Sequence, residues 1–143
     1  MHIILPIHKI HFQHLIPHKG LMGLIDQVDS WDTNEISCST RSHLSLTNPL
    51  IEKNCISVMH LIEYGAQAMA IHSGLLLGKP LQGFLAAVRD VNFYIDDMHN
   101  VLGVLCIKAV FELKLNDNVV YTIKVEDEYS MLLLKARISV VQI

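Results

Sequence analysis

The chain has 143 residues, the usual length of one domain, and we expect a single domain over residues 1–143. Hydrophobic residues make up 51% of it and charged residues only 17%, so we expect an oligomer whose interface covers apolar surface. The net charge of −3, without a cluster of Lys and Arg, argues against nucleic-acid binding.

The N-terminal segment lacks the basic start of a secretory signal, and no uninterrupted apolar run reaches about 18 residues, so we expect no membrane span. Three widely spaced cysteines, Cys38, Cys55 and Cys106, do not form an even-numbered disulfide framework. The sequence shows no Cys–His pairing either, which gives little support to catalysis by a thiol nucleophile. We therefore expect reduced thiols and a cytoplasmic protein.

The first third of the chain predicts a short helical turn and a hairpin. Residues 8–16 favour a helical turn that Pro17 closes. Residues 21–32 predict a strand, residues 32–35 a turn, and residues 36–44 the second strand, because apolar and polar residues alternate there.

A long helix is predicted from Ser57 to about Leu77. Ser57 is a suitable N-cap, Gly78 a suitable C-cap, and Pro80 ends any continuation. Four strands are predicted after it, at residues 83–94, 101–115, 119–126 and 131–141, with a tight turn at 116–118. A helix that is apolar on nearly all sides, followed by antiparallel strands, predicts an α+β fold with the sheet wrapped around the helix.

Glu63 stands out because it lies within this apolar helix, and no Lys or Arg occurs between residues 56 and 72. His60, three residues before it, and Gln67, four residues after it, share its face of the helix. Burial favours the protonated form of a carboxylic acid, which near neutral pH can act as a general acid. The alternative is a Glu at the edge of a buried helix whose carboxylate reaches solvent.

Three segments carry a family resemblance. Residues 15–19 (LIPHK) with residues 24–28 (LIDQV) resemble an opening motif L-x-P-H-R…L-x-D-R-V, residues 61–67 (LIEYGAQ) resemble a helix motif E-x-x-A-Q, and residues 83–93 (GFLAAVRDVNF) resemble the strand that follows. Together they resemble the (3R)-hydroxyacyl-ACP dehydratases of the hot-dog fold. The resemblance implies an antiparallel sheet wrapped around one long central helix.

One motif of that family is missing here. Its active members carry G-H-F-P-G-x-P just before the helix, and the His of that motif is the catalytic base. Residues 48–57 contain neither His nor Gly. The pattern is closer to a divergent branch found in aryl-polyene clusters, in which a dehydratase-like subunit without the His motif accompanies an active one.

By resemblance, Glu63 is the acid that protonates the departing hydroxyl of a 3-hydroxyacyl thioester. His60 is the first candidate for a substitute base, although a partly buried His near a dimer interface would look the same. His18 of the opening motif either lines the tunnel mouth or positions the helix. The residues that we expect to bind substrate are Gln67, His18, Gly83, Phe84 and Leu85.

Four histidines, His8, His11, His14 and His18, raise the possibility of a metal site. Pro17 makes a regular helix there doubtful, and no Cys or acidic residue is spaced to complete a ligand set. We therefore expect neither a metal nor a cofactor.

Three functions remain open. The first is a 3-hydroxyacyl-ACP dehydratase of fatty-acid or polyene biosynthesis, which binds acyl-ACP or acyl-CoA thioesters as a homodimer or as a hetero-oligomer with another hot-dog subunit. The second is a non-catalytic hot-dog subunit that stabilises an active dehydratase. The third is an acyl thioesterase, since helix carboxylates in this fold can also activate water.

Overall fold

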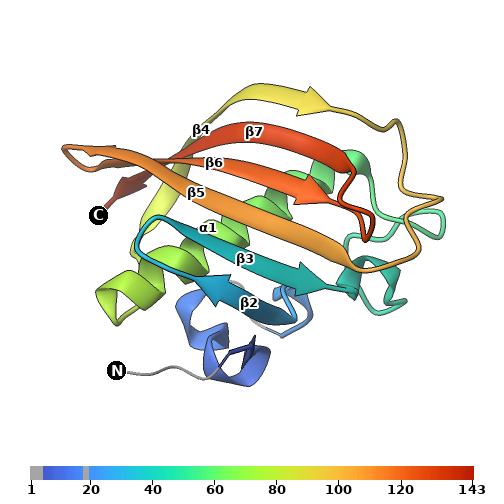
Figure 1. Ribbon diagram of the computed structural model, residues 1–143, viewed down its shortest axis with the longest axis horizontal. Helices are drawn as coiled ribbons and strands as arrows, with labels where there is room; N and C mark the ends of the chain where they lie inside the picture. Colours follow the sequence, from blue (N-terminus) through green and yellow to red (C-terminus); the bar gives the residue numbers. More distant parts are fainter. Residues whose placement is uncertain (1–4, 18–19) are drawn as a thin grey trace.

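The computed structural model describes residues 5–17 and 20–143. Their strands form one antiparallel seven-stranded sheet in the order β1-β2-β3-β5-β6-β7-β4 (Figure 1). No helix in the described part of the chain is both long and apolar enough to cross a membrane. The bounds are β1 Ile7–His8, β2 Gln27–Trp31, β3 Glu35–Thr40, α1 Leu61–Leu77, β4 Gly83–Phe93, β5 Leu105–Leu115, β6 Asn118–Glu126 and β7 Leu132–Gln142.

The helix α1 lies against the inner face of the sheet, as Figure 1 shows, and its main contacts are with β3, β5, β6 and β7. Tyr64, Ala68 and Ile71 on the helix are fully buried, and so are Ile107 and Ile123 on the strands that face it. These buried side chains of the helix and the sheet pack against each other and form the core. The predicted α+β fold, with a sheet wrapped around an apolar helix, is confirmed.

The predicted C-terminal end of the helix is confirmed, whereas α1 itself begins at Leu61, four residues after the predicted N-cap Ser57. The Ser57 hydroxyl accepts a hydrogen bond from the Met59 N–H at 3.2 Å and starts a 3₁₀ turn, Val58–His60, that leads into α1. At the other end Gly78 adopts a left-handed φ of 74°, and its N–H donates to the Gly74 carbonyl at 2.8 Å. A residue with a side chain is strained in that conformation, which is why glycine suits this position.

The N-terminal elements are shorter than predicted. The helical turn over 8–16 consists of two 3₁₀ turns, Lys9–His11 and Gln13–Leu15, and is preceded by β1, which the sequence did not indicate. The strand expected from residue 21 begins at Gln27, because a 3₁₀ turn covers Gly20–Met22. Its partner strand ends at Thr40.

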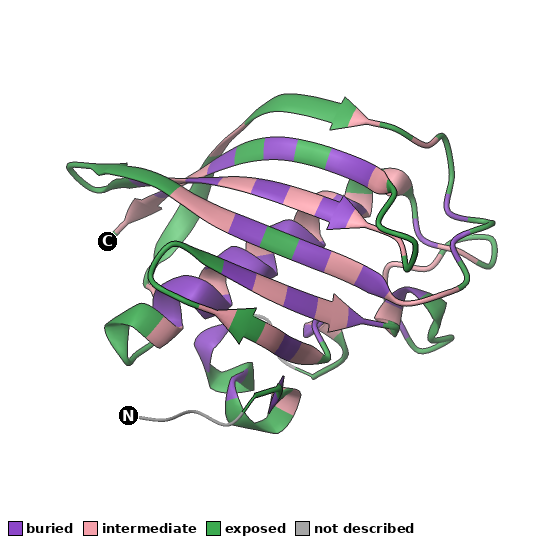
Figure 2. Cartoon of the chain, viewed as in Figure 1, coloured by how far each residue is buried: buried purple, intermediate pink, exposed green. Residues whose placement is uncertain are grey.

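The strand β4 forms one end of the sheet. It pairs with β7, the last strand of the chain, rather than with its neighbour in sequence. Its opposite edge pairs with no strand among the described residues. Figure 2 shows this strand as exposed over most of its length, and the exposed apolar side chains include Phe84 and Leu85. An exposed apolar edge strand is a place where another chain can pair.

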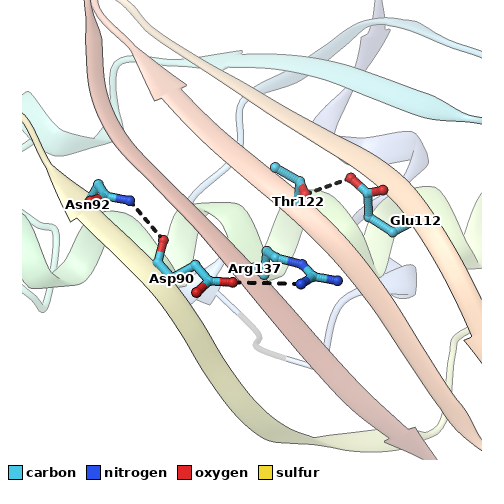
Figure 3. Close-up of polar contacts among 5 residues, drawn as sticks. All are labelled: Asp90, Asn92, Glu112, Thr122 and Arg137. Atoms are coloured by element: carbon cyan, nitrogen blue, oxygen red, sulfur yellow. Dashed lines mark hydrogen bonds and ion pairs between the residues drawn. The ribbon is translucent and has the colours of Figure 1, made fainter.

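Burial alternates along β6 and β7, so that one face of the sheet packs on the core and the other is more exposed (Figure 2). On this face Arg137 forms an ion pair with Asp90 at 3.7 Å, and the Thr122 hydroxyl donates to Glu112 at 2.7 Å (Figure 3). The Asn92 amide donates to the Asp90 carbonyl at 3.2 Å. Such exposed pairs contribute at most about 1 kcal/mol each, so this face does not hold the fold together.

Candidate functional site

A pocket of about 160 Å³ lies between α1 and the start of β4. Among the described residues that line it, Glu63 is the only ionisable one, and most of the others are apolar. The pocket therefore combines an apolar wall with a single carboxyl group. Its lining residues are Pro17, Glu63, Ala66, Gln67, Met69, Ala70, Leu81, Gly83, Phe84, Leu85 and Val140.

Glu63 lies in the first turn of α1 and is half-buried. Ala66 and Ala70, one and two turns further along the helix, line the same pocket and are half-buried as well. Their spacing places all three on one face of the helix, which is the face that the sheet does not cover. The carboxyl group is thus accessible from the pocket, as a group that transfers a proton to a bound molecule must be.

Gln67 is held by the backbone of another segment. Its Oε1 accepts a hydrogen bond from the Leu24 N–H at 2.8 Å, and its Nε2 donates to the Met22 carbonyl at 2.7 Å. Only 1% of Gln67 is exposed. The amide ties the loop before β2 to the helix and so shapes the pocket wall, while a direct role of Gln67 in substrate binding stays a prediction.

The three residues of β4 that we expect to bind substrate, Gly83, Phe84 and Leu85, are all among those that line the pocket. Gly83 approaches β7 closely, because a Cβ atom at this position would lie 2.5 Å from the Val141 carbonyl oxygen. Phe84 and Leu85 are 57% and 49% exposed. The pocket wall therefore includes the start of β4, whose other edge pairs with no strand among the described residues.

Two histidines, His60 and His18, were predicted for the site. His60 ends the 3₁₀ turn before α1, and it is not among the residues that line the pocket. Its Nδ1 is buried and has no hydrogen-bond partner among the described residues. His18 lies outside the described residues.

The segment without the family His motif forms a tight turn. Glu52 and Cys55 exchange two backbone hydrogen bonds of 2.9 and 3.2 Å, and Lys53 and Asn54 between them adopt positive φ angles of 51° and 74°. The Cys55 Sγ lies 3.7 Å from Nδ1 and 3.9 Å from Nε2 of His99. The expectation that no cysteine pairs with a histidine is therefore wrong, because the partner is 44 residues away in sequence.

A buried polar network on the opposite side of α1 was also missed. The His72 Nε2–H donates to the Asp32 carbonyl at 2.7 Å, so Nδ1 is the acceptor for the Tyr121 hydroxyl at 2.5 Å. Ser73 lies 3.1 Å from the same hydroxyl. Burial lowers the pKa of His72 and raises the pKa of Tyr121. The network joins α1, β6 and the β2–β3 turn, and an apolar helix pattern gives no signal for it.

No group of three or more His, Cys, Asp and Glu side chains is placed to hold a metal ion within residues 5–17 and 20–143. Of the four histidines that raised the possibility of a metal site, His8 lies in β1, and His11 and His14 lie in two 3₁₀ turns. His18 lies outside the described residues.

The family model of ApeP-like proteins, described as ApeP dehydratase, matches residues 10–143. The chain belongs to the ApeP-like dehydratase family. The predicted assignment to a divergent dehydratase-like group is thereby confirmed. A comparison with curated protein sequences gives no significant match.

Solved structures confirm the hot-dog fold of this ApeP-like chain. "The Dehydratase Heterocomplex ApeI:P from Xenorhabdus doucetiae" matches with a TM-score of 0.80 and 21% identity, over 98% of this chain and 92% of that chain. AziG of S. sahachiroi matches with a TM-score of 0.66 and 13% identity, over 90% of this chain and 98% of that chain. A hypothetical thioesterase with coenzyme A from Streptococcus pneumoniae matches with a TM-score of 0.58 and 14% identity, over 81% of this chain and 84% of that chain. At these identities the likeness concerns the fold alone.

Proposed function

We propose that this ApeP-like protein is a dehydratase subunit that binds 3-hydroxyacyl thioesters of acyl carrier protein or coenzyme A, with Glu63 as general acid. The observation that carries the proposal is a pocket whose described lining is largely apolar and contains one ionisable group, the carboxyl group of Glu63. An acyl chain needs an apolar wall, and a departing hydroxyl needs a proton donor.

The reaction breaks the C2–H and C3–O bonds of the acyl chain and leaves a 2-enoyl thioester and water. Glu63 donates its proton to the hydroxyl as the C3–O bond breaks, and a base takes the proton from C2. The described lining of the pocket holds no second ionisable group. We propose that the base lies outside this described lining, with His60 and a residue of another subunit as the candidates.

A second hot-dog subunit is the partner that we propose for the open edge of β4. This edge lies beside the pocket, because Gly83, Phe84 and Leu85 belong to both. A chain that pairs with β4 would cover the exposed apolar side chains and bring its own residues next to Glu63. The resemblance to one chain of the ApeI:P dehydratase heterocomplex supports a partner of a different sequence.

The test is a dehydration assay with a short 3-hydroxyacyl-ACP and a His-containing hot-dog subunit present. We expect Glu63→Gln to lower the rate of enoyl formation by about 10²–10⁴-fold, the usual contribution of general acid–base catalysis. Glu35→Gln is the matched control, because Glu35 is an exposed glutamate on β3 outside the pocket. Full activity of Glu63→Gln would overturn the role of Glu63.

The absence of His from residues 48–57 favours a second candidate, a subunit that only stabilises its partner. In that case the complex needs this chain for activity, but neither Glu63→Gln nor His60→Gln lowers the rate. A thioesterase would instead release a free acid and a thiol from the same substrate, and the assay separates these products from an enoyl thioester.

The assembly is tested separately by Leu85→Lys, since a lysine on an edge strand opposes pairing with another chain. We expect this variant to lose the complex in size-exclusion chromatography. Leu46→Lys serves as the control, because Leu46 is 89% exposed and lies in a loop outside the sheet. Equal loss in both variants, or in neither, would count against the β4 edge as the interface.

A further inference from the structure

Cys55 and His99 form a thiol–imidazole pair at the surface, with the Cys55 Sγ 3.7 Å from Nδ1 of His99. Cys55 is half-buried and His99 is exposed. The two residues come from separate segments, the turn before α1 and the connection between β4 and β5. Neither lines the pocket at Glu63, so the pair is distinct from the proposed active site.

Local contacts anchor both members of the pair. Cys55 closes the tight turn by its two backbone hydrogen bonds with Glu52. The His99 N–H donates to Asp97 Oδ1 at 3.0 Å, and the neighbouring Met98 is only 3% exposed. Because both backbones are anchored, the contact between sulfur and ring needs little further ordering of the chain.

The other two cysteines lie in different surroundings. Cys38 is 1% exposed, and burial raises the pKa of its thiol far above the usual range. Burial also raises the pKa of Cys106, and the nearby Asp29 adds to this effect. Thiols that resist ionisation are poor nucleophiles. Cys38 and Cys106 are therefore expected to react more slowly than an exposed thiol that lies beside a base.

We propose that Cys55 is a reactive thiol that His99 activates, and that it is a site of reversible modification by small disulfides. The His99 imidazole takes the thiol proton while the Cys55 sulfur attacks one sulfur of the disulfide. A new S–S bond joins Cys55 to that half, and the other half leaves as a thiolate that accepts the proton back from the imidazolium. The disulfide is the oxidant, so atoms and electrons balance.

The experiment follows the reaction of the native protein with oxidised glutathione, and mass spectrometry measures the occupancy of each cysteine over time. We expect Cys55 to react about tenfold faster in the native protein than in the urea-unfolded chain, after correction with a free thiol in the same urea. His99→Asn should lower the native rate about tenfold. His11→Asn, which removes another exposed histidine, should leave it unchanged.

If Cys55 were only exposed, it would react with oxidised glutathione no faster in the native protein than in the unfolded chain, where it is exposed as well. A native rate equal to or below the unfolded rate overturns the proposal, and so does a His99→Asn rate equal to the wild-type rate. Circular dichroism of each variant verifies that the fold is kept. Because Glu63→Gln alters neither residue, it should leave this rate unchanged, which keeps this test independent of the dehydratase assay.

Discussion

Replacement of Gln67 by Met tests whether this side chain holds the fold or binds substrate. Met has a similar length and is apolar, so the substitution removes both hydrogen bonds without opening a large cavity. It leaves the buried Leu24 N–H and the half-buried Met22 carbonyl without their partner. The buried Leu24 N–H left unsatisfied costs about 1–3 kcal/mol, and the half-buried Met22 carbonyl, which water can reach, costs about 1 kcal/mol, so we expect a loss of about 2–4 kcal/mol in the free energy of unfolding.

At roughly 3–4 °C per kcal/mol for a chain of this size, the melting temperature should fall by about 6–16 °C. Calorimetry at one fixed protein concentration measures it, because assembly would make the value concentration-dependent. Gln13→Met is the control, since Gln13 is exposed in a 3₁₀ turn. A Gln67→Met protein with wild-type stability but a raised KM would refute the structural reasoning and favour direct contact with substrate.

Three further outcomes are expected. Gly65→Ala should lower the free energy of unfolding by about 1–2 kcal/mol, because its Cβ would lie 2.2 Å from the Ile123 Cδ1; a urea titration that shows unchanged or increased stability would refute the close approach. Burial lowers the pKa of both His72 and His43 from 6.5, so below that pH the unfolded state binds protons that the folded state does not. The free energy of unfolding should therefore fall as the pH drops from 6.5 toward the lowered pKa values of the two histidines. A urea midpoint of unfolding that stays constant over this range would contradict this. Gly83→Val should bring a side chain against the β7 backbone and so distort the start of β4 and the pocket. Thioester binding, measured by calorimetry, should then weaken at least about tenfold.

The parts of the fold predicted correctly from sequence are those that depend on local signals. Gly78 ends the helix and Ser57 caps the 3₁₀ turn that leads into it, because capping needs only the residues nearby. The turn at 116–118 and the strands on either side of it follow from alternation and turn residues in one short segment. The buried central helix followed from its composition, since an apolar surface on nearly all sides requires cover on nearly all sides.

The features that were missed depend on contacts between distant residues. β1 has only two residues, which is too short for any periodicity to show. The amide of Gln67 meets a backbone group 43 residues away, and the thiol of Cys55 meets a ring 44 residues away. Which chemistry such residues perform depends on the neighbours that the sheet brings to them. Glu63 was found because a carboxyl group is unusual in an apolar helix, even without knowledge of its neighbours.

The incomplete chemistry of the pocket and the open edge of β4 fit one explanation. Elimination of water needs a proton donor and a proton acceptor, and the described pocket lining offers the carboxyl group of Glu63 alone. The pocket is lined in part by β4, the edge strand with which a second chain would pair. Under the proposed function, assembly and activity are therefore linked, and the Leu85→Lys variant should lose enoyl formation together with the complex. If it lost the complex but kept the activity, the base would belong to this chain, and His60→Gln would then be the variant that abolishes the reaction.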